Sequence, residues 1–294
     1  MEPDEWFQTM VEDASDGRLI IDTKMNLFKD GTDTVMAVID GRVDAGRFHC
    51  AWASGTFPLW DHLSVPFVYN SPIEFEQARH DPRMLEIYKE SYADAGLVQI
   101  GSYGCDGNLA VWANKPIRTV EDFKGMKIRA SGVLPSLNMK ALGAAPITVA
   151  GPEIPEAILR GVLDAALSDR SWAFGVGVGD VTTHLNRWTF TPSFANSIVV
   201  NKEKFDSLPP DLQQILLDVG DRLSSHVNFT TAFSGALLDA NIEGAGLELV
   251  FPSDAEMEKA RKLCEPVADE WIAIDGVGAL GAEILEIAAK YRRY

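Results

Sequence analysis

The sequence has 294 residues, of which 46% are apolar and 23% charged, and its formal net charge is −17. This composition is typical of an ordered globular protein, and the length exceeds the about 150 residues of a common domain, which indicates two lobes. Nucleic-acid binding needs a basic surface that displaces counterions, so the acidic charge and the lack of a Lys/Arg cluster exclude that class of partner. No apolar run reaches the about 18 residues of a membrane span, and direct membrane insertion is therefore not predicted.

In the first part of the chain, segments of helical period alternate with short β-rich runs, which predicts an α/β fold. We expect helices over Pro3–Ala14 and Thr32–Ile39 and a helical pattern over Ile73–Ala95. The breaker Asn114-Lys115-Pro116 predicts a crossing into a second lobe. The expected strands are Leu19–Thr23, Val43–His49, Val98–Tyr103 and Leu109–Ala113.

The middle of the chain repeats the alternation on a smaller scale, with Thr119 as a helix cap and Gly143 and Gly161 as helix ends. Short strands joined by helices are what a parallel sheet requires. Ligands of such sheets bind beyond the carboxyl ends of the strands, where Arg129, Ala150 and Ser168 lie. The expected strands are Met126–Arg129, Ile147–Ala150 and Val162–Leu167; the expected helices are Val120–Phe123, Leu134–Leu142 and the segment 152–161.

A strand over Ser193–Asn201 leads into a helical pattern of over thirty residues between 208 and 246. Such a helix would measure about 50 Å, which exceeds the width of one lobe, so we expect it to brace both lobes, with Gly220 or Gly235 able to tolerate a bend. Two further helices are expected at Asp254–Ile274 and Ala279–Tyr291. We assign 1–115 with about 195–235 to lobe I and 116–194 with about 236–294 to lobe II, with a ligand cleft between them.

The sequence offers no catalytic or metal-binding signature, because it has neither G-x-S-x-G nor H-E-x-x-H and its five histidines are scattered. The glycines of F-G-V-G-V-G-D at 174–180 favour a flexible turn over a phosphate loop, since no strand precedes them. The cysteines are odd in number and lack C-x-x-C spacing, so we expect buried thiols, with a Cys50–Cys105 bridge as the alternative. We therefore predict no enzyme activity, no cofactor and no metal.

Arg129 is the main candidate for ligand binding. At the end of a predicted strand, its guanidinium can meet a carboxylate with two parallel charge-assisted bonds. The alternative is an ordinary surface ion pair.

The region around Arg129 resembles a known family. It contains D-x-K-G-x-K-I-R at 122–129, L-G-A-x-P at 142–146 and E-x-x-x-A-x-x-x-G-x-x-D-A at 153–165. Further matching stretches are V-E-D-A-S-D-G-R at 11–18, G-R-V-D-A at 41–45, V-P-F at 65–67 and N-K-E-K-F-D-S-L-P at 201–209. In this order they are similar to the DctP-type solute-binding proteins of TRAP (tripartite ATP-independent periplasmic) transporters. The resemblance implies a two-lobed fold like that of periplasmic binding proteins, with Arg129 on the ligand's carboxylate.

The resemblance also implies further pocket residues. The strand end after Gly41 would face the cleft, which makes Arg47 a second cation and Trp52 either a cover for an apolar ligand part or a core residue. Asp169 either orients Arg170 or accepts a hydrogen bond from the ligand, and Trp172 is a pocket wall or a core residue. The pocket candidates are Arg129, Arg47, Phe48, His49, Trp52, Asn108, Leu109, Gly151, Ser168, Asp169, Arg170 and Trp172.

Two of these candidates depart from the family pattern. Leu109, beside Asn108, stands where sialic-acid binders of the family place a second arginine, and Gly151 stands where an aromatic residue is often found. Both departures favour a bulkier or less polar acid over a sugar acid.

The implied function is capture of a small organic acid and delivery to integral-membrane TRAP permease subunits. The family usually has an export signal and a strand before the helix at Pro3–Ala14, and this sequence shows neither, so the periplasm is implied by the resemblance alone. Two alternatives stay open. A ligand sensor for a signalling receptor would lack a neighbouring permease gene, and an enzyme on a similar fold would turn over a bound acid.

Overall fold

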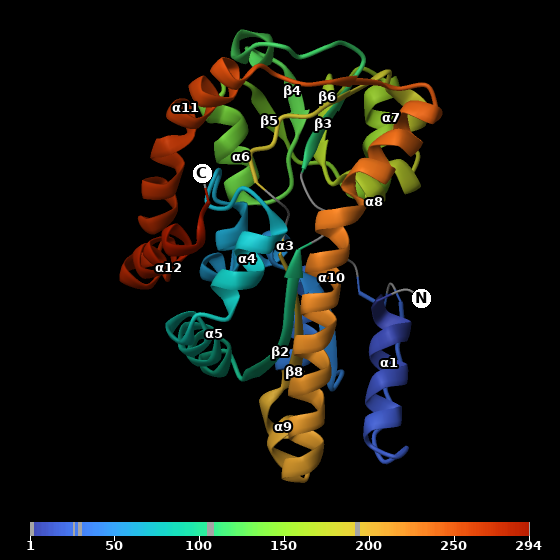
Figure 1. Cartoon of the computed structure of the whole chain (residues 1–294), viewed down its shortest axis with the longest axis vertical. Helices are drawn as coiled ribbons and strands as arrows, with labels where there is room; N and C mark the ends of the chain where they lie inside the picture. Colours follow the sequence, from blue (N-terminus) through green and yellow to red (C-terminus); the bar gives the residue numbers. More distant parts are fainter. Residues whose placement is uncertain (1–2, 26, 29–30, 105–108, 192–194, 294) are drawn as a thin grey trace.

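The computed structural model describes residues 3–25, 27–28, 31–104, 109–191 and 195–293. Two β-sheets, each flanked by helices, lie one beyond the other along the long axis of the molecule, and helix α10 (Pro210–Gly244) runs past both (Figure 1). The predicted α/β fold with a long bracing helix is therefore confirmed. None of the described helices is both long and apolar enough to cross a membrane.

The first sheet has three antiparallel strands in the order β1 (Ala45–His49), β8 (Ala195–Asn201) and β2 (Leu97–Gly104). Every residue of β8 is buried, as expected for the central strand. The helical pattern predicted over 73–95 forms two helices, since Asp81 caps a new helix that Pro82 begins. The helices of this part are α1 (Pro3–Ala14), α2 (Gly31–Ile39), α3 (Cys50–Ala53), η1 (Pro58–Ser64), α4 (Pro72–Arg79), α5 (Pro82–Asp94) and α9 (Lys202–Ser207).

The second sheet has six strands and is mixed. Its order is β5 (Ala145–Ile147), β4 (Lys127–Arg129), β6 (Ala165–Ser168), β3 (Ala110–Ala113), β7 (His184–Asn186) and β9 (Glu248–Val250). Strands β5, β4 and β6 are parallel, and so are β7 and β9, whereas β3 is antiparallel to both of its neighbours. The helices of this part are η2 (Val120–Phe123), α6 (Val133–Ala141), η3 (Gly151–Glu153), α7 (Ile154–Leu159), α8 (Arg170–Gly175), η4 (Gly179–Val181) and α11 (Asp254–Ile272).

One predicted strand is wrong. Residues 19–23 form no strand; Leu19 and Ile21 instead pack against the apolar cluster under α1 and α10, which explains their alternation. The parallel arrangement predicted for the strands at 126–129, 147–150 and 162–167 is confirmed by β4, β5 and β6, and β3 joins them antiparallel to β6. The predicted lobe boundary at 114–116 stays a prediction; because β3 already pairs with β6, the packing favours a crossing before Ala110.

Helix α10 packs closely on β2 and then reaches the second sheet. An added Cβ at Gly220 would lie 1.9 Å from the carbonyl oxygen of Ile100, so this glycine permits close contact. The Ser224 hydroxyl accepts from the amide of Ser102 at 2.9 Å, and Asn228 Oδ1 accepts from that of Gly104 at 2.9 Å. Farther along, α10 contacts α8 and β9. These contacts fasten one helix to both sheets.

The last helix, α12 (Gly278–Tyr291), packs on α4 and η1 beside the three-stranded sheet. Its buried Ile284 and Ile287 join the apolar cluster that includes Phe75 of α4. The assignment of 236–294 to one lobe stays a prediction, and this packing favours placing α12 with the other lobe.

Cys50 and Cys264 are buried free thiols. Burial raises the pKa of each thiol to about 12, so both are protonated at neutral pH. Cys105 lies outside the described residues.

Candidate functional site

The guanidinium of Arg129 lies at the end of β4 and is held by the two neighbouring chain segments. Its Nε donates to the carbonyl oxygen of Val149 at 3.4 Å, and its Nη1 donates to that of Leu167 at 3.3 Å. Val149 follows β5 and Leu167 belongs to β6, so the parallel strand order fixes the guanidinium. Nη2 makes no hydrogen bond to any described residue. It can therefore donate to a ligand oxygen.

Arg129 is only 4% exposed. Burial lowers the pKa of its guanidinium to about 10, and the nearby Asp169 carboxylate opposes that shift. The group remains charged at pH 7. Because a desolvated cation gains much from a second anion, the position favours binding of a carboxylate.

His49, at the end of β1 in the three-stranded sheet, lies close enough to Arg129 to feel its charge, and Trp52 stacks on His49. His49 ends β1, and burial, then Arg129, then Arg47 lower its pKa to about 3, so its ring is neutral at pH 7. The indole of Trp52 in α3 stacks on that ring with centroids 5.3 Å apart and planes 20° apart, and Trp52 is 43% exposed. The structure thus brings one cation and two flat rings together from both sheets.

Arg47 is engaged by the first helix. Its Nε and Nη2 donate to the two carboxylate oxygens of Asp4 in α1, each at 3.0 Å. This bidentate pair offsets much of the Arg47 charge, so Arg47 is a weaker anion partner than Arg129.

The part of the molecule around the three-stranded sheet contacts the part around the six-stranded sheet near these residues. An added Cβ at Gly132, which has φ +92°, would lie 2.6 Å from the carbonyl oxygen of Ala51. One residue later, the amide of Val133 donates to Ser54 Oγ at 3.4 Å. Helix α3, beside the three-stranded sheet, therefore contacts the start of α6, beside the six-stranded sheet.

On the second-sheet side, Asp169 caps α8. Its Oδ1 accepts from the amide of Trp172 at 2.8 Å, which fixes the first turn of the helix. The indole of Trp172 lies directly over Gly151, whose added Cβ would be 2.4 Å from Cη2 of the ring. Glycine at position 151 therefore leaves room for this indole.

Arg170 reaches α10. Its Nη1 donates to the carbonyl oxygen of Gly235 at 3.0 Å and to the carboxylate of Asp239. Arg187 binds the other oxygen of the same carboxylate, so two largely buried cations share one anion. Sequence reasoning missed Asp239 and Arg187. The only signal for Asp239 was a single carboxylate in the mostly apolar run A-L-L-D-A.

The remaining predicted site residues occupy different environments. Phe48 is 3% exposed in the apolar core of the first sheet, and Leu109 is 1% exposed in the cluster under the second sheet. Ser168 is the buried last residue of β6. Asn108 lies outside the described residues.

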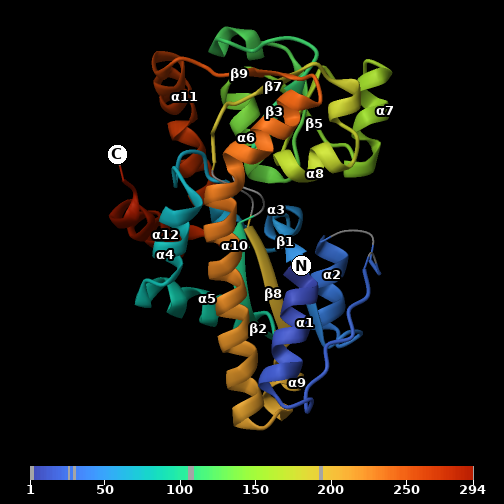
Figure 2. The same cartoon turned by 45° about the vertical axis from the view of Figure 1, so that its right-hand side comes forward.

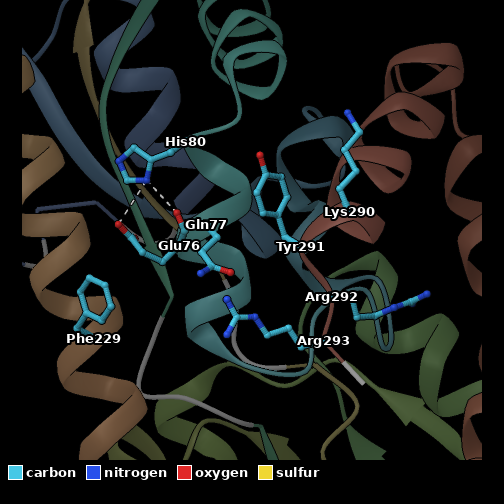
Figure 3. A pocket seen from close by; sticks show the side chains of 8 residues that line it. All are labelled: Glu76, Gln77, His80, Phe229, Lys290, Tyr291, Arg292 and Arg293. Carbon is cyan, nitrogen blue, oxygen red and sulfur yellow. Dashed lines mark hydrogen bonds and ion pairs between the residues drawn. The ribbon is translucent and has the colours of Figure 1, made fainter.

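A cavity of about 650 Å³ lies elsewhere, between α4, α10 and the end of α12 (Figure 3). Its buried carboxylate, Glu76, is occupied by bonds to Arg79, Ser225 and Asn228, each 2.7–2.8 Å long. Lys290 points away from Gln77 in Figure 3. The cavity contains none of the predicted ligand-binding residues, and its lining also includes the basic residues Lys290, Arg292 and Arg293.

Within the described ranges, no group of three or more His, Cys, Asp or Glu side chains could hold a metal ion. The glycine-rich stretch 175–179 forms the turn between α8 and η4, where Gly177 has φ +82°. This position agrees with the predicted turn.

Comparison with known proteins identifies a family of bacterial solute-binding proteins. The family model DctP, described as bacterial extracellular solute-binding protein, family 7, matches residues 4–274. Among curated relatives, the ectoine-binding periplasmic protein TeaA of Halomonas elongata is 26% identical, over 68% of this chain and 59% of TeaA.

Solved structures extend the similarity to the whole fold. An extracytoplasmic solute receptor of Bordetella pertussis binding pyroglutamic acid superposes with a TM-score of 0.87 at 23% identity, covering 98% of this chain and 94% of that one. A TRAP periplasmic solute-binding protein of Desulfovibrio desulfuricans with bound sn-glycerol-3-phosphate gives a TM-score of 0.90 at 19% identity, covering 100% and 94%. At these identities the likeness establishes a shared fold.

Proposed function

The chain belongs to the DctP family, family 7 of the bacterial extracellular solute-binding proteins, and on that premise we propose that it captures a small organic acid through Arg129. It then delivers the acid to the membrane permease of a TRAP transporter. The proposed place of capture is the periplasm, and the proposed role is binding without catalysis.

One observation carries the choice of an anionic ligand. The Arg129 guanidinium is buried and held at Nε and Nη1, while Nη2 has no bond to a described residue. A ligand carboxylate at this edge would form a charge-assisted bond in a region of low dielectric. The guanidinium needs no reorientation, because two backbone carbonyls already fix it, and this preorganisation favours affinity.

The ligands of the related structures support the same chemical class. Pyroglutamic acid in the Bordetella receptor and sn-glycerol-3-phosphate in the Desulfovibrio protein are both small and acidic. We propose that the ligand of this chain is a monocarboxylate or dicarboxylate, since Arg129 is the best placed of the candidate cations. The Asp169 carboxylate beside it helps to keep the guanidinium charged.

We propose that the two sheets form the centres of two lobes that close on the ligand. Figure 2 shows the strands of the six-stranded sheet above those of the three-stranded sheet. The first lobe would carry His49 at the end of β1 and Trp52 in α3, and the second would carry Arg129 at the end of β4 and Asp169 before α8. Helix α10, fixed to both, would be the element that limits the motion. Closure would exclude water from Arg129 and present a closed surface to the permease.

A thermal-shift screen tests the proposal. Purified protein is heated with monocarboxylates, dicarboxylates, sugar acids and aromatic acids, and with neutral and cationic compounds of similar size. A ligand at 100 times its dissociation constant should add about 2.7 kcal/mol of stability. Stabilisation by acids alone, with the acid recovered unchanged by chromatography, is the expected result. A neutral or cationic best ligand, or chemical conversion of the acid, would contradict the proposal.

A further inference from the structure

Gly151 and Trp172 form a tight contact that a side chain at position 151 would prevent. An added Cβ at Gly151 would lie 2.4 Å from Cη2 and 2.7 Å from Cζ2 of the indole. Two carbon atoms cannot approach so closely, so the ring keeps its position only while residue 151 is glycine. The backbone of Gly151 is not in the left-handed region, and the missing side chain is therefore explained by space for the indole.

This contact involves the two chain segments that hold the guanidinium of Arg129, and Trp172 packs against the same apolar cluster as Val149. The two carbonyls that hold Arg129 belong to Val149 and Leu167. Two residues after Val149 the chain reaches Gly151, and two residues after Leu167 it reaches Asp169, which caps the turn that carries Trp172. The two segments that hold Arg129 are therefore also in contact with each other at Gly151 and Trp172.

The opposite side of the same region also presents an indole. Trp52 is 43% exposed and stacks on His49, whose pKa responds to Arg129. In Figure 2, α3, which carries Trp52, lies below α8, which carries Trp172. An acid bound to Arg129 could therefore contact a flat apolar side chain from each side, Trp52 from α3 and Trp172 from α8.

We propose that Trp172, admitted by Gly151, is the specificity-determining wall of the acid site, and that it selects carboxylates with a flat, partly apolar body. This inference rests on the proposed function and narrows it to a class of acid. The indole provides a rigid plane, because Asp169 fixes the first turn of α8 and Gly151 supports the ring edge. A planar acid can lie against this plane over its whole face, whereas a puckered ring of similar size cannot.

The test compares two glycine substitutions that add the same methyl group. Gly151→Ala forces the indole out of its place. Gly175→Ala lies in the same helix as Trp172, has nothing within 4 Å of its added Cβ and has no left-handed φ, so it is the matched control. Calorimetric titrations use benzoate and furan-2-carboxylate as planar acids, cyclohexanecarboxylate as the puckered acid, and acetate as the small acid.

The wild type should prefer benzoate to cyclohexanecarboxylate, and Gly151→Ala should lower affinity for the planar acids by about tenfold or more while changing acetate binding less. Gly175→Ala should behave as the wild type. Trp172→Phe keeps a smaller ring and should tolerate Gly151→Ala better than the wild type does. Circular dichroism verifies that each variant is folded.

Equal effects of Gly151→Ala on planar and small acids, or equal binding by the Gly151→Ala and Gly175→Ala variants, would overturn the inference and leave the acid-binding role intact. A wild type that prefers the puckered acid would overturn it as well. If the wild type binds none of these acids and none in the wider screen, the proposed function and this inference both fail.

Discussion

Arg170 and Asp239 form an ion pair that joins the start of α8 to the long helix α10. Arg170 is 2% exposed, and Arg187 shares the same carboxylate. Since Arg170 directly follows Asp169, which lies beside Arg129, this pair connects the proposed acid site to the helix that spans both sheets.

Asp239→Asn should destabilise the protein by about 3–5 kcal/mol, because it leaves two largely buried cations without their anion. Urea unfolding followed by circular dichroism measures the change. Glu243→Gln, an exposed carboxylate-to-amide change in the same helix, is the control and should shift stability by less than about 0.5 kcal/mol. Similar values for both variants would show that the buried pair contributes little.

Gly220→Ala should destabilise the protein although alanine is the better helix former. Helix propensity alone predicts a gain of about 1 kcal/mol. The added Cβ, however, would lie 1.9 Å from the carbonyl oxygen of Ile100, so α10 must move away from β2, at a cost of about 1–3 kcal/mol or more. Gly244→Ala, with nothing within 4 Å, is the control. A more stable Gly220→Ala variant would contradict the close packing of α10.

The same residue illustrates what the sequence could and could not predict. Local pattern was sufficient for α10, for the strand that ends at Arg129 and for the turns at Gly143 and Gly161, because helical period and breaker residues act within a few positions. The role of Gly220 depends on a strand more than a hundred residues away, so the sequence predicted only that this glycine tolerates a bend and did not predict the close contact with Ile100.

The sequence also could not predict which strands pair with each other. Strands β7 and β9 have three residues each, too few to show an alternating pattern, and the direction of β3 depends on neighbours distant in sequence. Arg129 could be predicted from its position at a strand end. The ion pair between Arg170 and Asp239 could not be predicted, because it depends on where α10 places Asp239 in space.

His49→Gln should weaken the acid sensitivity of the fold. The pKa of His49 is lowered to about 3 from 6.5, chiefly by burial, so between these values the unfolded chain binds a proton that the folded chain does not. Stability from this group is therefore lost as pH falls from about 6.5 towards 3, with a slope of about 1.4 kcal/mol per pH unit. Urea titrations at pH 5 and 7 should show a smaller difference in the variant. An unchanged difference would place His49 in a solvated environment.

Asp61→Asn should act in the opposite pH direction. Burial raises the pKa of Asp61 from 3.8 to about 8, while its bond to Ser64 opposes the rise. The carboxyl group is thus protonated in the folded state at pH 7, and its contribution to stability is present below about pH 4 and lost as pH rises to about 8. The variant should gain stability relative to the wild type as pH increases from 4 to 8. A constant difference over this range would show that Asp61 is ionised in the folded state.

The most direct test of the account is calorimetric titration of the best acid from the screen into the wild type and into Arg129→Gln and Arg129→Lys variants. Arg118→Gln, which removes an exposed arginine paired with Glu248, is the matched control. We expect that Arg129→Gln weakens binding by about 2–5 kcal/mol, that lysine restores little of this loss because it cannot reproduce the planar fork, and that the control binds as the wild type does. A loss below about 0.5 kcal/mol in Arg129→Gln would remove Arg129 from the site and contradict the capture mechanism.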